Sequence, residues 1–275
     1  MAERDPALRL RVLSALALVP LALLLVWWGG WGFAAFVALA VVLMALEWAH
    51  LTGFRYGRRS GWIAGAAVLA VGLGATLLIA LGHAQAALAC LLAGMPLAGL
   101  VAWAGGGRPG WTALGVGYIG LPALALLWLR GVPDLGFAIL VWLFVVVWTT
   151  DTAAYFAGRA IGGPRLAPAI SPSKTWAGLC GGMLGAALTG GALAAWHLGS
   201  GRLLQAAGLG ALLAVVAQIG DLVESGFKRA AGVKDSGTLI PGHGGLLDRV
   251  DGLLFAAPAL ALLGLLAGPE TLPWR

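Results

Sequence analysis

Acidic residues are few in this sequence and unevenly placed. Only 11 of the 275 residues are Asp or Glu. Six of them fall in two polar stretches of the C-terminal half, namely Asp151, Asp221, Glu224, Asp235, Asp248 and Asp251. Carboxylates are hard oxygen ligands of the kind that Mg²⁺ prefers, so helix ends that each present an Asp predict one acidic site. The other five acids are expected to be solvated near termini or span ends: Glu3, Asp5, Glu47, Asp134 and Glu270.

The segment that begins at Asp221 places several polar side chains at helical spacing. If the apolar run before it continues as a helix, positions i, i+3, i+4 and i+7 share one face. These positions hold Asp221, Glu224, Ser225 and Lys228, with Arg229 beside them. We expect Gly232 to end this helix. A solvated salt bridge between Glu224 and Lys228 is the alternative explanation for that pair.

A glycine-rich segment follows this predicted helix. Gly242, Gly244 and Gly245 surround His243, and closely spaced glycines let successive backbone N–H groups turn toward one anion. Lys234 and Arg249 add positive charge that suits phosphate oxygens. The alternative is a flexible turn, which does not explain why glycine, histidine and basic residues occur together.

Asp248 and Asp251 lie three residues apart where the last apolar run begins. This spacing places both on one helix face, and a helix N-terminus favours carboxylates. Helix capping accounts for either aspartate alone. Together with the basic residues, the acids predict a site for a polyphosphate and a divalent cation, since Mg²⁺ bridges carboxylates to substrate phosphates.

The elements that would position these residues are membrane-spanning helices. Hydrophobic residues make up 60% of the chain and charged residues 10%, whereas a soluble domain has about 25% charged residues. Runs of about 20 apolar residues cross a bilayer as helices. We predict an all-α polytopic protein with one membrane-embedded catalytic domain, residues 1–275, and catalytic loops at 151–176 and 221–251. Its nine expected spans are 10–28, 31–47, 61–82, 84–104, 111–128, 134–150, 177–198, 203–220 and 252–268.

The basic residues predict the orientation of these spans. With nine spans, 14 of the 17 Lys and Arg residues fall on the side of the N-terminus and three, Arg130, Arg202 and Arg275, on the other. Positive residues mark the cytoplasmic side, so we expect the N-terminus and the acidic site to be cytoplasmic. The net charge of +6 then reflects topology, and no nucleic acid partner is expected.

Residues 225–251 resemble the signature of the phosphatidate cytidylyltransferases. The matching positions are Ser225-Gly-Phe-Lys228-Arg229, Lys234-Asp235, Pro241-Gly-His243-Gly244-Gly245 and Asp248-Arg249-Val-Asp251. The stretches at 218–224, 151–159 and 170–176 are also similar to the family's pattern. Gly163 and Ser173 depart from it, because lysine is frequent at both positions in the family.

The resemblance implies an enzyme that transfers CMP from CTP to phosphatidic acid in the bilayer, works as a homodimer and uses two metal-binding aspartates. These map to Asp221 and Asp248, with Asp251 as a possible further ligand for Mg²⁺ and a second cation. Residues expected to contact the CTP phosphates or pyrophosphate are Lys228, Arg229, Lys234 and His243. Other expected substrate-binding residues are Asp151, Ser171, Ser173, Lys174, Ser225, Asp235, Gly244, Gly245 and Arg249.

Two alternative functions stay open at this stage. One is a cytidylyltransferase or kinase for another lipid, such as a polyprenol or an ether lipid, because acceptor selectivity depends on spans that carry no motif. The other is a transporter, which would place charges near the middle of the membrane. The motif charges cluster at one face, which favours an enzyme over a transporter. The Lys and Arg bias and the compactness of the chain indicate a bacterial inner membrane as the expected location.

Overall fold

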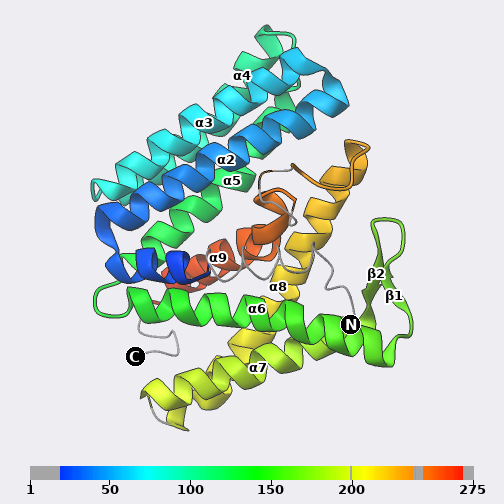
Figure 1. Cartoon of the computed structure of the whole chain (residues 1–275). Helices are drawn as coiled ribbons and strands as arrows, with labels where there is room; N and C mark the ends of the chain where they lie inside the picture. Colours follow the sequence, from blue (N-terminus) through cyan, green and yellow to red (C-terminus); the bar gives the residue numbers. More distant parts are fainter. Residues whose placement is uncertain (1–18, 199, 238, 240–243, 269–275) are drawn as a thin grey trace, which may run out of the picture. The chain divides into compact units, whose positions relative to one another are not determined.

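Long apolar helices make up most of the chain. The computed structural model describes residues 19–198, 200–237, 239 and 244–268 (Figure 1). Eight of the described helices are long and apolar enough to cross a membrane, and a shorter apolar helix covers Val19–Trp28. The eight are α2 (Gly30–Tyr56), α3 (Arg58–Ala80), α4 (Ala84–Ala104), α5 (Pro109–Arg130), α6 (Gly136–Ile161), α7 (Trp176–Leu198), α8 (Leu203–Ala230) and α9 (Leu247–Ala267).

These helices confirm the predicted all-α membrane protein, but four of them extend well beyond the predicted apolar runs. α2 continues to Tyr56, α6 continues to Ile161, α8 continues to Ala230 and α9 begins at Leu247. The expected loops at 151–176 and 221–251 are therefore partly helical. Hydropathy marks where a chain leaves lipid, whereas a helix ends only where its backbone is broken. Gly162 and Gly163, which both have positive φ, follow the last residue of α6.

A short β-hairpin, absent from our prediction, follows α6. Strands β1 (Arg165–Ala167) and β2 (Ser171–Thr175) are antiparallel, with Arg165 opposite Thr175 and Ala167 opposite Ser171. The turn closes with a hydrogen bond from the Ile170 N–H to the Ala167 carbonyl, 3.1 Å. Thr175 then starts α7, because its Oγ1 accepts a hydrogen bond of 3.0 Å from the Gly178 N–H.

The chain divides into two compact units whose boundaries fall inside helices. One comprises Met1–Leu127 with Phe227–Val250, and the other Trp128–Gly226 with Asp251–Arg275. Each contains helices of membrane-spanning length, so neither is a separate soluble domain. The single membrane-embedded catalytic domain, residues 1–275, stays a prediction.

In the first unit, α2 packs closely against α3 (Figure 1). A Cβ added to Gly61 would lie 2.4 Å from the Ala49 carbonyl oxygen, and one added to Gly65 would lie 2.6 Å from the Ala49 Cβ. Small residues of this kind let helix backbones approach each other in lipid. The rings of Trp48, Trp111 and Phe227 cluster with centroids 5.1–5.4 Å apart, joining α2 and α5 to the last turns of α8.

In the second unit, α6 packs against α7 in the same way (Figure 1). A Cβ added to Gly181 would lie 2.2 Å from the Ala157 Cβ, and one added to Gly185 would lie 2.6 Å from the Ala153 Cβ. This close contact fixes the two helices that flank the hairpin. The hairpin is thereby held at the ends of α6 and α7.

Candidate active site

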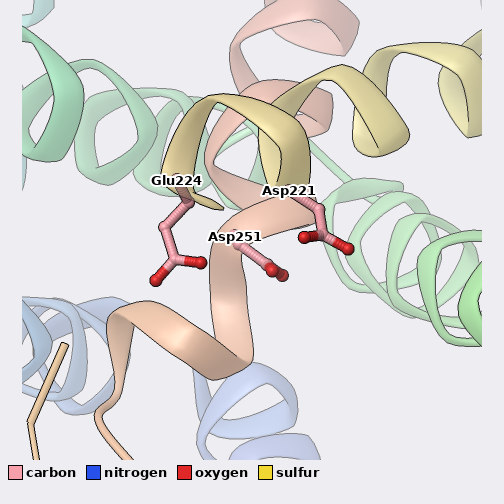
Figure 2. Close-up of side chains that lie close together, drawn as sticks. All are labelled: Asp221, Glu224 and Asp251. Atoms are coloured by element: carbon pink, nitrogen blue, oxygen red, sulfur yellow. The ribbon is translucent and has the colours of Figure 1, made fainter. Parts of the chain in front are cut away.

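Three carboxylates gather on α8 and α9 in the second unit. One oxygen each from Asp221, Glu224 and Asp251 lies within 4.8 Å of the others. Figure 2 shows the three side chains on one side of α8, with Asp251 reaching them from α9. Glu224 is 1% exposed, so it lies inside the protein and is not the solvated side chain of the alternative explanation. Asp151 on α6 is exposed, and its charge repels Asp251.

Two glycines allow the helices that carry these carboxylates to approach closely. A Cβ added to Gly220 would lie 2.5 Å from the Asp251 carbonyl oxygen and 3.1 Å from the Phe255 side chain. A Cβ added to Gly252 would lie 3.2 Å from the Ala217 Cβ. The glycines therefore stand beside Asp221 and Asp251 in the chain, at the point where α8 and α9 touch. Their lack of a side chain brings the carboxylates together.

The hairpin supplies a cation to this carboxylate cluster. Lys174 Nζ on β2 lies 2.5 Å from Asp221 Oδ2, and the two side chains are 15% and 29% exposed. The Ser225 hydroxyl, one turn further along α8, donates to Asp221 Oδ1 at 3.4 Å. The structure thus brings together three predicted residues, Lys174, Asp221 and Ser225.

The donor set of the carboxylate cluster fits a divalent cation. All three residues offer carboxylate oxygens, which Mg²⁺ prefers over nitrogen or sulfur ligands. When ionised, the three carboxylates and the Lys174 ammonium carry two net negative charges, which one divalent ion would neutralise. Glu224 was absent from the predicted metal ligands. Its position one turn from Asp221 on the shared face was the signal that could have identified it.

Asp248 has a different environment, in the first unit. Its Oδ1 lies 2.6 Å from Lys228 Nζ, and the two side chains are 4% and 13% exposed. Its Oδ2 accepts hydrogen bonds from the Ser236 N–H (2.9 Å), the Ser236 hydroxyl (2.9 Å) and the Gly245 N–H (2.8 Å). Both Asp248 oxygens therefore accept hydrogen bonds from protein groups. The Gly245 N–H, which was expected to face a substrate anion, donates to this carboxylate of the protein.

The end of α8 forms as predicted. The Gly232 N–H bonds to the Arg229 carbonyl and the Val233 N–H to the Lys228 carbonyl, both at 3.0 Å, and Gly232 has φ +74°. This pair of bonds is a Schellman motif, which requires a left-handed residue and therefore favours glycine. The confirmed stop at Gly232 places Lys228 and Arg229 in the last turn of α8.

Glu47 contradicts the expectation that it would be solvated. It is 6% exposed on α2 and accepts hydrogen bonds from the Leu246 N–H (2.6 Å) and the Leu247 N–H (2.8 Å). The prediction was wrong because its apolar run ends near Glu47, whereas α2 continues to Tyr56. An acid well inside a helix was the available signal, but its partners lie about 200 positions away.

The other predicted residues vary in exposure. Arg229, Lys234, Asp235 and Arg249 are exposed in the first unit, and Gly244 is half-buried with φ +81°. In the second unit Ser171 is half-buried and Ser173 exposed, and the Ser173 carbonyl accepts a bond of 3.5 Å from Arg165. His243 lies outside the described residues, as do Glu3, Asp5 and Glu270.

Fold and site together define an integral membrane protein with a carboxylate cluster where two spanning helices meet and a lysine against it. The sequence model of the cytidylyltransferase family matches residues 9–266, and the chain belongs to that family.

Three relatives of this chain are named after the same enzymatic activity. The chain is 44% identical over 269 residues to a phosphatidate cytidylyltransferase of Brucella melitensis, covering 97% of this chain and 96% of the relative. It is 42% identical over 278 residues to a phosphatidate cytidylyltransferase of Pseudomonas aeruginosa, covering 95% and 98%. A Staphylococcus aureus protein of the same name is 42% identical over 128 residues, 46% of this chain and 49% of that one. Nearly the full length of the chain is thus similar to such transferases.

Proposed function

We propose that this protein is a phosphatidate cytidylyltransferase, which transfers CMP from CTP to phosphatidic acid and releases pyrophosphate to give CDP-diacylglycerol. The observation that carries the proposal is the cluster of Asp221, Glu224 and Asp251 with Lys174 beside it, at the meeting point of two membrane-length helices. Family membership over residues 9–266 supports the same reaction class.

The reaction suits a site made of carboxylates and cations. A phosphate oxygen of phosphatidic acid attacks the α-phosphorus of CTP, and the bond between the α- and β-phosphoryl groups breaks. The attacking oxygen is already anionic at neutral pH, so no side chain has to remove a proton from it. Bound Mg²⁺ would supply charge neutralisation and positioning of the phosphoryl oxygens. The protein's task is to bring two anions together and stabilise pyrophosphate.

We assign the metal-holding role to Asp221, Glu224 and Asp251. Ser225 orients Asp221, and Lys174 offsets part of the negative charge, so that an anionic substrate can approach the carboxylates. The sequence prediction that Asp248 is also a ligand requires Lys228 and the backbone donors to share its oxygens with the ion. A second cation at this site stays a prediction.

Other residues are proposed to bind the anionic groups of the substrates. Ser171, Ser173 and Lys174 on the hairpin hold the phosphate of phosphatidic acid, and Asp151 either orients this segment or approaches the metal. The CTP phosphates and the leaving pyrophosphate are assigned to Lys228, Arg229, Lys234, His243 and Arg249, with Asp235, Gly244 and Gly245 shaping that segment. Positively charged donors of this kind stabilise charge that develops on the leaving group.

The location follows from the lipid substrate. Phosphatidic acid keeps its acyl chains in the bilayer, so its head must enter the site from the side, at headgroup depth. We propose that the site faces the cytoplasm of a bacterial inner membrane, where CTP is available, and that the enzyme acts as a homodimer. The excess of Lys and Arg on the side of the N-terminus supports this orientation.

Transfer of radioactive CMP tests the proposal directly. Purified protein in detergent is incubated with α-labelled CTP and phosphatidic acid, with and without Mg²⁺, and label in the organic phase is counted. We expect Mg²⁺-dependent labelling of CDP-diacylglycerol and release of pyrophosphate. Parallel reactions offer phosphorylated polyprenol and ether-linked phosphatidic acid. Preference for one of these acceptors, or labelling from γ-labelled nucleotide, would replace the proposal with another lipid cytidylyltransferase or a kinase.

A further inference from the structure

Helix α2 carries two charged residues that bind the two helix ends flanking the α8–α9 connection, residues 231–246. Glu47 accepts from backbone N–H groups at the start of α9, and the Arg55 guanidinium donates to the Ala230 carbonyl at the end of α8. Each charge has the sign that the helix dipole favours, negative at an N-terminus and positive at a C-terminus. All of these residues belong to the first unit.

The contacts of Glu47 are those of a helix cap supplied by a distant part of the chain. The N–H groups of a first helical turn have no partner within their own helix. Glu47 Oε1 lies 2.6 Å from the Leu246 N, and Oε2 lies 2.8 Å from the Leu247 N. Bonds between a carboxylate and buried N–H groups are about twice as strong as those between neutral groups. One buried side chain thus fixes the first residues of α9.

Ser236 connects Glu47 to Asp248. The Ser236 hydroxyl lies 2.9 Å from Asp248 Oδ2 and 3.3 Å from Glu47 Oε2, and the residue is fully buried. Two carboxylates converge on this hydroxyl, and the Lys228 ammonium at Asp248 together with the N-terminus of α9 offsets their charge. Glu47 therefore acts on Asp248 and Lys228 through Ser236 and α9.

Little space remains around this arrangement. A Cβ added to Gly245 would lie 2.1 Å from Ser236 Oγ and 2.8 Å from Glu47 Oε1. A Cβ added to Gly237 would lie 3.2 Å from Glu47 Cγ. The described parts of the connection that flank Asp248 are therefore packed directly onto the Glu47 side chain.

We propose that Glu47 is a positioning residue, which sets the shape of the segment that presents Asp248 and Lys228 to the nucleotide. The proposal rests on the proposed function for what that segment binds, but the structural part of it can be measured without substrate. Glu47 acts by holding Ser236 and the N-terminus of α9 in place.

Hydrogen–deuterium exchange on purified Glu47→Gln and wild-type protein tests the structural part. Glutamine keeps the size of the side chain but replaces one acceptor oxygen by an NH₂ group, which faces an N–H donor. We expect exchange of the amides at 245–247 to accelerate by about tenfold or more, as loss of a charged hydrogen bond implies. Exchange at 60–80 in α3 should not change. Unchanged exchange at 245–247 would overturn the proposal.

CMP transfer by the same variant tests the functional part. We expect kcat to fall roughly 10–100-fold, the usual effect of removing a group that orients catalytic residues, with a smaller change in KM for CTP. A variant with faster exchange and normal kcat would refute the positioning role. Wild-type protein without activity would instead refute the proposed function, while the exchange result stands on its own.

Two further variants separate positioning from general stability. Ser236→Ala removes the hydroxyl between the two carboxylates and leaves the α9 cap in place, so it should also lower kcat. This variant tests the positioning role if Glu47→Gln does not fold. Thr52→Val is the matched control, because Thr52 is fully buried on α2 and its hydroxyl donates to the Trp48 carbonyl of the same helix. Thr52→Val should leave kcat and exchange at 245–247 unchanged. If Thr52→Val lowers kcat as much as Glu47→Gln does, the role is only structural.

Discussion

At the scale of single residues, the acids of this protein differ in what surrounds them. Asp221, Glu224 and Asp251 place oxygens within 4.8 Å of one another, whereas both oxygens of Asp248 already hold protein donors. Like charges gathered at such short distances repel unless a cation joins them. We therefore expect substitutions of the first three residues to change the Mg²⁺ requirement of the reaction. Substitution of Asp248 should instead destabilise the segment whose donors it accepts.

Asp251→Asn should lower CMP transfer by about a hundredfold or more, because one of the three proposed metal ligands loses its charge. The concentration of Mg²⁺ for half-maximal activity should rise. The measurement is a titration with Mg²⁺ of protein shown to be monodisperse by gel filtration. Asp134→Asn is the matched control, since Asp134 is exposed and asparagine tolerates its φ of +61°. Normal activity of Asp251→Asn would exclude Asp251 from the metal site.

Asp248→Ala should remove activity and also destabilise the protein. It takes one partner from a partly buried ion pair, which costs up to roughly 3–5 kcal/mol, and it leaves the Ser236 and Gly245 N–H groups without their acceptor. Thermal unfolding in detergent should show a lower Tm for Asp248→Ala than for Asp251→Asn. Equal Tm values for the two variants would mean that the contacts of Asp248 contribute little to stability.

At the scale of elements, two structures position the carboxylate cluster: the close contact between α8 and α9, and the hairpin between α6 and α7. The first depends on Gly220 and Gly252, and the second places Lys174 on β2 against Asp221. Thr175 fixes the end of β2 by capping α7. Small changes in either element should therefore change catalysis without changing any residue that is proposed to bind metal.

Gly220→Ala should reduce activity by up to about a hundredfold, because displacement of catalytic groups by about 1 Å has effects of that size. The added Cβ would lie 2.5 Å from the Asp251 carbonyl oxygen, so α8 and α9 must separate. Gly208→Ala is a matched control on α8, since a Cβ there meets nothing within 4 Å. Both variants are compared by initial rate at saturating Mg²⁺. Similar rates for the two would show that the close approach is unimportant.

Lys174→Gln should have opposite effects on metal binding and on turnover. Without the ammonium beside Asp221, the carboxylates attract Mg²⁺ more strongly, so half-maximal activity should need less Mg²⁺. Turnover should fall about tenfold or more, because the substrate phosphate loses a charged donor. Rates measured across Mg²⁺ concentrations report both quantities. A higher Mg²⁺ requirement would contradict this arrangement of charges.

At the scale of the whole molecule, the described residues include eight membrane-length helices, and the chain divides into two compact units. Most of the acidic and basic residues discussed above belong to one predicted side of the membrane. That distribution allows a soluble nucleotide and a lipid headgroup to meet without a charged side chain in the bilayer centre, where insertion costs about 2.5–3.5 kcal/mol.

Cysteine labelling in intact bacterial cells tests the predicted orientation. In a background without Cys90 and Cys180, Gly201→Cys should react with a membrane-impermeant maleimide from outside. Gly110→Cys should react only after the cells are opened. Both glycines are exposed, and a Cβ at either position meets nothing within 4 Å. The reverse pattern would place the N-terminus and the candidate site outside the cytoplasm.

Hydropathy and local motifs determined much of this protein from sequence alone. Apolar runs predicted α2 to α9 because lipid leaves an isolated chain only helices that satisfy their own backbone. Gly232 predicted the end of α8, and residues 225–251 indicated the family, since both signals are local in the chain. The first expected span, 10–28, is described only from residue 19.

Only the tertiary structure decided which charges meet. Glu47 looked like a solvated residue, yet it binds amides about 200 positions away, and Glu224 joined Asp221 and Asp251 where α8 crosses α9. No pattern in the sequence predicted the hairpin that brings Lys174 to Asp221. Such contacts depend on how closely two helices can approach, which the volumes of residues such as Gly220 set in three dimensions. The spacing of residues along one helix does not predict the distance between that helix and its neighbour.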